Sequence, residues 1–70
     1  MKPFVLLNAD SPNDDYKKSD RGYVDGYVVG ADQKPYAVVV LLDYKESSGY
    51  LPSGVIVLAP MYHLTVTGRF

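Results

Sequence analysis

Three carboxylates lie close together in the sequence and have the chemistry needed to hold a cation: Asp10, Asp14 and Asp15. A calcium loop of the EF-hand kind that began at Asp10 would require glycine at its sixth position and glutamate at its twelfth. Those positions hold Asp15 and Arg21, and Pro12 interrupts the segment. We therefore interpret the cluster as a solvated acidic loop, and expect no bound metal and no other cofactor.

Nucleophilic catalysis would have to use the single histidine, His63, with Ser47, Ser48 or an aspartate. Such catalysis needs a nucleophile, a base and an orienting group that rigid neighbours hold together. A lone histidine on a strand face and serines in a separate polar loop do not indicate that geometry. We expect that the chain is not an enzyme.

Tyrosines form the strongest candidate for a binding surface, because the chain has 7 of them and no tryptophan. In the segment 22–29, Tyr23, Asp25 and Tyr27 alternate with Val24 and Val28, so the two sets are predicted to face opposite sides of a strand. If the valines fill the core, the two rings face outward beside a polar loop. The predicted binding residues are Tyr16, Lys17, Lys18, Arg21, Tyr23, Asp25 and Tyr27.

Two kinds of partner fit this surface. Exposed tyrosines with mixed charge favour recognition of a protein. The alternative is single-stranded nucleic acid, with bases stacked on the rings and Lys17, Lys18 and Arg21 near the phosphates. The formal net charge of -1 favours the protein partner, because nucleic-acid binders carry a basic excess. In a third interpretation, the loop 8–20 folds over this face and buries one or both of the rings.

Composition sets the broad class of the protein. The chain has 70 residues, which predicts one domain over 1–70. Apolar residues make up 47% and charged residues 21%, as in a globular protein. There is no cysteine, so disulfides and thiolate metal sites are excluded. The apolar runs are too short for a membrane span or a signal peptide, so we expect a cytoplasmic protein without membrane contact.

Apolar alternation and turn residues divide the chain into five predicted strands: 4–7, 22–29, 36–42, 55–59 and 63–67. Gly26 indicates a bend or bulge inside the second strand. Ser11 followed by Pro12 is typical of a helix start, so the long first loop is expected to carry at most a short helical turn. A tight or 3₁₀ turn is predicted at Pro60–Tyr62.

Five short strands with such a turn before the last one resemble the Src-homology-3-like small β-barrel superfamily, which includes the KOW and Tudor domains. The resemblance spans Phe4–Thr67 and implies an all-β, five-stranded, small, partly open barrel with a long first loop. Gly49–Ser53 also resembles the segment that contacts proline peptides in signalling members, but the chain lacks their paired tryptophans. The short chain, tyrosine-rich hairpin and acidic loop together resemble accessory proteins of phages and mobile elements, whose partner would be a host protein.

Burial is predicted from the same alternation. The segment 36–42 is apolar at every position after Tyr36, which indicates a central strand covered on both faces. Its outward set, Tyr36, Val38, Val40 and Leu42, would form a patch that monomers rarely expose, and we therefore expect a homodimer. The predicted core consists of Val24, Val28, Val39, Leu41, Ile56, Leu58, Leu64 and Val66.

Overall fold

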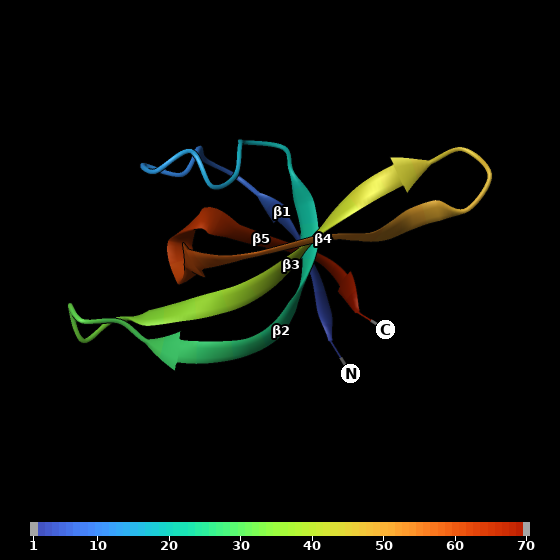
Figure 1. Cartoon of the computed structure of the whole chain (residues 1–70). Helices are drawn as coiled ribbons and strands as arrows, with labels where there is room; N and C mark the ends of the chain where they lie inside the picture. The colour runs from blue at the N-terminus through green and yellow to red at the C-terminus, as the bar shows by residue number, and fades with distance from the viewer. Residues whose placement is uncertain (1, 70) are drawn as a thin grey trace.

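The structure, a computed structural model, describes residues 2–69, and within them it contains one five-stranded sheet (Figure 1). A single 3₁₀ turn, η1, directly precedes the last strand. The bounds are Pro3–Leu7 for β1, Arg21–Val29 for β2, Pro35–Lys45 for β3, Gly49–Pro60 for β4, Met61–His63 for η1 and Leu64–Arg69 for β5. The predictions of an all-β protein, five strands and a 3₁₀ turn before the last strand are confirmed.

The strands follow the order β4-β3-β2-β1-β5, and every neighbouring pair is antiparallel. Strands β1 to β4 therefore lie side by side in chain order, and β5 returns to the free side of β1. The edge strands β4 and β5 are joined in sequence by η1 but are not paired with each other. The sheet is twisted and open rather than closed, so the predicted barrel is not formed.

The loop 8–20 takes the place of barrel closure in covering the core. Its Tyr16 ring is buried together with Leu7 of β1 and Ala59 of β4. Backbone bonds fix both ends of the loop: Leu7 N donates to Asp20 O at 2.8 Å, and Asn8 N donates to His63 O at 2.9 Å. A folded loop can thus bury the sheet face without hydrogen bonds between the two edges.

The first loop contains turns and bends, and no helix is present in the part of the chain that the structure describes. Ser11 still acts as the sequence suggests, because its Oγ accepts a hydrogen bond from Asn13 N at 3.2 Å. The backbone of Asp14 then takes a φ of 61°. This left-handed conformation ends the turn before a helix can propagate.

A β-bulge in β2 changes which side chains share a face. Val24 lies opposite Val39 and Gly26 lies opposite Val38, so Asp25 has no partner in β3. Because an extra residue reverses the alternation that follows it, Tyr23 and Tyr27 point to opposite sides of the sheet. The bulge itself was predicted from Gly26, but the prediction that the two rings share a face is wrong.

The core lies on one face of the sheet, under the first loop, and its buried apolar members are Val5, Leu7, Tyr16, Val24, Ala37, Val39, Val57 and Ala59. Of the predicted core, Val24 and Val39 are buried, and Leu41 and Leu64 pack against the cluster. The other four predicted members are exposed: Val28, Ile56, Leu58 and Val66. The bulge explains Val28, which lies opposite Tyr36 on the other face.

The orientation of β4 explains why two further predicted core residues, Ile56 and Leu58, are exposed. Val57 lies opposite Val39, and Ala59 lies opposite Ala37, so these small residues face the core. Ile56 then lies opposite Val40 on the other face. The segment 55–59 is apolar at every position, and its sequence therefore contains no alternation that could indicate the buried side.

The hairpin between β3 and β4 extends well beyond the rest of the sheet (Figure 1). It was predicted as a polar loop. Two features keep it paired: Tyr44 lies opposite Tyr50 with the ring centroids 5.2 Å apart, and Ser48 N donates to Lys45 O at 3.1 Å in the turn. The guanidinium carbon of Arg21 also lies 5.7 Å from the centroid of the Tyr50 ring, within the range of a cation–π interaction.

We expect that replacing Gly22 with alanine lowers the free energy of unfolding by about 1–3 kcal/mol, the usual effect of overpacking. A Cβ atom at Gly22 would lie 2.6 Å from Val39 Cγ1 and 2.6 Å from the Val40 carbonyl oxygen. Gly26→Ala is the matched control, because its Cβ would meet no atom of the described residues within 4 Å. Urea denaturation of both variants tests this, and equal stabilities would contradict it.

Candidate functional site

Tyr16, one of the predicted binding residues, is a core side chain with only 3% of its surface exposed. Its phenol forms a hydrogen bond of 2.7 Å with Nδ1 of His63, and the two rings meet edge to face. The single histidine of the chain therefore anchors the first loop to η1. Neither side chain is free to form a surface with Tyr23 or Tyr27.

We expect that the domain loses stability above about pH 10 and that Tyr16 contributes to the loss. Burial raises the pKa of the Tyr16 phenol above its ordinary value of 10.0, with smaller contributions from Tyr62 and Asp15. A raised pKa in the folded state stabilises the fold below the unfolded pKa, and this contribution disappears as the pH rises through the folded pKa. Denaturation as a function of pH tests this.

The matched variant for this pH series is Tyr16→Phe, which has no ionisable phenol at this position. Its stability should fall less steeply above pH 10 than that of the wild type. Tyr36→Phe is needed beside it, because a hydrogen bond to Asp32 also raises the pKa of Tyr36. Parallel curves for wild type and Tyr16→Phe would contradict the assignment.

Tyr23 and Asp25 lie in a small cluster with Lys2. The Lys2 ammonium is 2.6 Å from Asp25 Oδ1 and 5.1 Å from the centroid of the Tyr23 ring. Lys2 thus neutralises the carboxylate of Asp25, which lies between the two tyrosines in the sequence. Tyr27 lies on the opposite side of the sheet and is well exposed. The part of each residue in binding stays a prediction, but no single flat partner surface contacts both rings.

The three basic residues of the predicted surface are exposed. Lys17 pairs with Asp14 at 3.7 Å, and its backbone N–H donates to Asp20 Oδ2 at 2.9 Å. Lys18 donates its backbone N–H to Asp10 Oδ1 at 2.7 Å. These bonds hold the first loop in shape and place acidic oxygens beside both lysines, which weakens the case for a phosphate-binding patch.

The other candidate sites considered from the sequence are not assembled. His63 lies in η1, whereas Ser47 and Ser48 lie at the tip of the β3–β4 hairpin, at the opposite end of the molecule (Figure 1). Among residues 2–69 no group of three or more metal-ligating side chains lies together. The carboxylate of Asp10 instead accepts the backbone bond from Lys18.

A groove runs along the outer edge of β4, with a volume of about 720 Å³. We call it the β4 groove. Residues 55–58 of β4 form its floor, Asn13 and Asp15 of the first loop form one wall, and residues 30–32 with Tyr36 of the β2–β3 hairpin form the other. Three segments that are distant in sequence thus surround one edge of the sheet.

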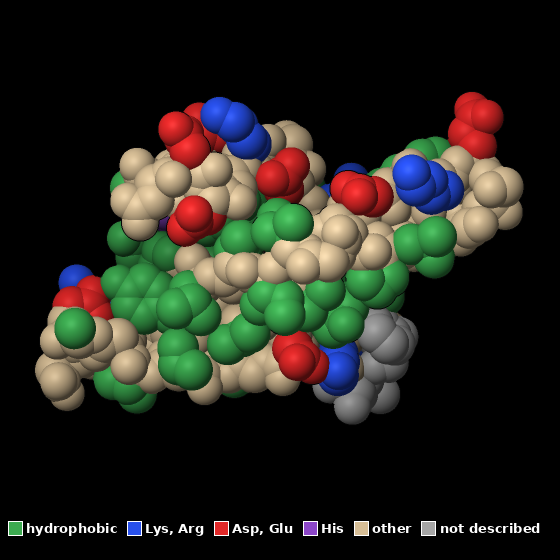
Figure 2. Space-filling view, viewed as in Figure 1, with side chains coloured by type: hydrophobic (Ala, Val, Ile, Leu, Met, Phe, Trp, Pro, Cys, Tyr) green, Lys and Arg blue, Asp and Glu red, His purple; other side chains and the backbone are tan. Residues whose placement is uncertain are grey.

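The floor of the β4 groove is apolar and open to solvent. Ile56 is 63% exposed and Leu58 is 53% exposed, although both are large aliphatic residues. Figure 2 shows the wider setting, a band of hydrophobic side chains across the middle of this face with both acidic and basic groups above it and at one end. An apolar strip of this kind is typical of a surface that contacts a partner.

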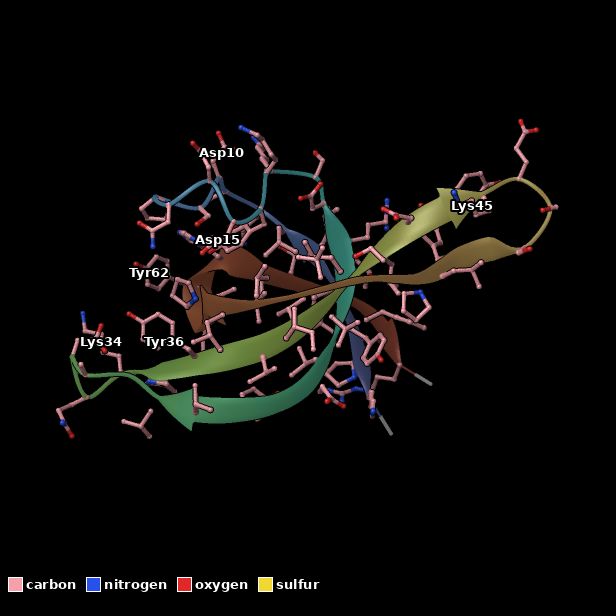
Figure 3. All side chains as sticks on the ribbon, in the orientation of Figure 1. Asp10, Asp15, Lys34, Tyr36, Lys45 and Tyr62 are labelled. Atoms are coloured by element: carbon pink, nitrogen blue, oxygen red, sulfur yellow. The ribbon has the colours of Figure 1, made fainter. Side chains whose placement is uncertain are left out.

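The charges on the walls of the β4 groove are negative. Asp15 and Asp32 line it, and among the described residues no lysine or arginine does. The Tyr36 phenol donates to Asp32 Oδ2 at 2.6 Å, and Lys34 N donates to Oδ1 at 3.1 Å. These bonds lower the pKa of Asp32, the bond from Tyr36 most strongly, so its carboxylate stays charged. Figure 3 shows Asp15, Tyr36 and Tyr62 at the same end of the molecule.

Sequence reasoning did not find the β4 groove. One signal was available: a run of five apolar residues, 55–59, lies between Gly54 and Pro60 without any alternation. The predicted core included Ile56 and Leu58 from this run. Its position at an edge depends on the strand order, which no local pattern contains.

Comparison of the chain with protein-family models, with curated proteins and with solved structures finds no match. No helix in residues 2–69 is long and apolar enough to cross a membrane. The interpretation of the site therefore depends on its own geometry.

Proposed function

We propose that this protein is a non-enzymatic binding module that recognises another protein through the β4 groove. One observation carries the proposal: large aliphatic side chains, Ile56 and Leu58, are exposed on an edge strand between two structured walls. Apolar surface in such a concave setting gains free energy when a partner removes it from water. Tyr36 and Tyr62 add rings at one end, and tyrosine is common in protein-binding surfaces.

The resemblance to the Src-homology-3-like superfamily is part of the same proposal. Five antiparallel strands in one sheet, with a 3₁₀ turn directly before the last strand, support it. In that case the present sheet is an opened variant in which the first loop covers the core. A phage or mobile-element accessory protein that binds a host protein is the biological setting that we propose for it.

Replacement of Ile56 by lysine should abolish capture of the partner. A charged side chain on the groove floor would have to be desolvated on binding, and loss of an apolar anchor weakens binding by about 2 kcal/mol or more. The fold should tolerate the change, since Ile56 is largely exposed. Immobilised protein captures partners from a lysate of the native host, and mass spectrometry identifies them.

Val66→Lys is the control, because Val66 is exposed on β5, the opposite edge of the sheet. The identified partner is then purified, and its affinity is measured for the wild type and both variants. Equal loss with Val66→Lys, or no loss with Ile56→Lys, would contradict recognition through the β4 groove.

Salt dependence separates this function from single-stranded nucleic-acid binding. Contacts with phosphates weaken steeply as salt rises, because counterions are released, whereas an apolar protein contact does not. Steep salt dependence, with competition by an oligonucleotide, would overturn the proposed function.

A further inference from the structure

The outer edge of β4 has backbone groups that the sheet does not use. Among residues 2–69, strand β4 pairs only with β3. In an antiparallel edge strand, alternate residues direct their N–H and C=O groups away from the neighbouring strand. No backbone bond outside the sheet ladders involves residues 56–58 in the described part of the chain. The floor of the β4 groove therefore offers hydrogen-bonding groups as well as apolar side chains.

We propose, on the basis of the function proposed above, that the occupant of the β4 groove is an extended segment of a partner protein. It adds as a further strand along residues 56–58 and carries lysine or arginine among apolar residues. Strand addition satisfies the unpaired backbone groups, and side chains at alternate positions contact the exposed ones of the edge strand. Prolines 52 and 60 bound this segment within β4.

Charge argues for a basic segment. The only charged groups in the walls, within residues 2–69, are the carboxylates of Asp15 and Asp32. Asp32 is held in place by its bonds with Tyr36 and Lys34. A lysine or arginine at either end of an added strand would meet one of these carboxylates, while an acidic segment would be repelled.

The same walls argue against a second copy of this chain. Pairing of two β4 strands about a two-fold axis would bring the Asp15 and Asp32 carboxylates of both copies to one interface. Like charges placed together there are unfavourable. The walls also rise on both sides of the edge, and a single strand about 4.8 Å from β4 enters more easily than a folded sheet that carries its own walls.

The test uses an eight-residue peptide of alternating valine and lysine as the probe, titrated into the ¹⁵N-labelled full chain. We expect chemical-shift changes at residues 55–58 and at Asp15 and Asp32. A matched peptide with glutamate in place of lysine should bind at least about tenfold more weakly. N-methylation of two backbone nitrogens that face β4 should also weaken binding about tenfold, because each lost hydrogen bond costs a few-fold in affinity.

Two variants of the protein complete the design. Asp15→Lys should lower the affinity for the valine–lysine peptide about two- to tenfold. Asp43→Lys, an equal change of charge at an exposed position on the β3–β4 hairpin, should leave it unchanged. An equal loss in both variants would show that only net charge matters and would overturn the proposal.

The remaining outcomes are decisive as well. Equal binding of the N-methylated peptide would overturn strand addition but would leave recognition through the groove intact. Absence of binding at millimolar peptide would overturn this inference alone, because the captured partner still tests the proposed function. A dimer in sedimentation equilibrium with residues 55–58 shielded would assign the groove to a second copy. Chemical-shift changes at residues 55–58 caused by oligothymidylate without any peptide would overturn both proposals.

Discussion

Tyr16→Ala is expected to lower the free energy of unfolding by about 3–5 kcal/mol, the range for truncation of a large buried aromatic side chain. Tyr16 is the one aromatic ring in the buried core of the described residues, and it comes from the loop that covers the sheet. The variant loses this packing and leaves a cavity between loop and sheet. Small domains are stable by only about 5–15 kcal/mol. The variant should therefore unfold at a much lower urea concentration than the wild type, as followed by circular dichroism.

Two companion variants separate the causes. Tyr16→Phe keeps the ring but loses the hydrogen bond to His63, which should cost about 0.5–1.5 kcal/mol. Tyr27→Ala removes an exposed ring of the same type and should change stability by less than about 1 kcal/mol. If Tyr16→Ala proves as stable as Tyr27→Ala, the first loop does not cover the core in solution.

The strand positions could be predicted from the sequence because their signals are local. Apolar runs and alternation identified all five strands, and Pro60 with the residues after it indicated the turn. The ends of β3 and β4 could not be predicted, since the hairpin 43–51 is polar and its pairing depends on the contact between Tyr44 and Tyr50 across the strands. A cross-strand contact of this kind is visible only once the register is known.

The faces of the strands were harder to predict than their positions. One extra residue, Asp25, reverses the alternation of β2, and a sequence pattern cannot show where the partner strand skips it. The all-apolar segment 55–59 could be turned either way. The core therefore contains Val57 and Ala59, small residues that lie close beneath the first loop, instead of Ile56 and Leu58.

The candidate site depended on the tertiary structure. Tyr16, Tyr23 and Tyr27 were grouped because they are close in sequence, but folding places them in the core, beside Lys2 and on the opposite side of the sheet. The β4 groove needs the first loop, the β2–β3 hairpin and β4 together. The sequence could indicate that Asp15 and Asp32 lie in exposed loops. It could not show that both loops border β4.

Leu7→Ala should lower the free energy of unfolding by about 2–5 kcal/mol, the usual cost of removing a buried leucine. Leu7 is the largest fully buried side chain of the described residues, with 0% exposed. It lies in β1, opposite Leu64 of β5, at the point where the first loop begins. Its backbone also bonds to Asp20 O and Ser19 N, each at 2.8 Å, which ties the two ends of the loop together.

Calorimetry measures this effect as a fall in Tm, since each kcal/mol corresponds to about 4–8 °C in a domain of this size. Leu51→Ala is the matched control, because Leu51 lies exposed on the β3–β4 hairpin and should shift Tm by only a few degrees. The same loop supplies the Asn13 and Asp15 wall of the β4 groove. Leu7→Ala should therefore weaken binding of the valine–lysine peptide even at temperatures below its Tm. If Leu7→Ala keeps the Tm of the wild type, β1 and the first loop are not packed together as the structure has them.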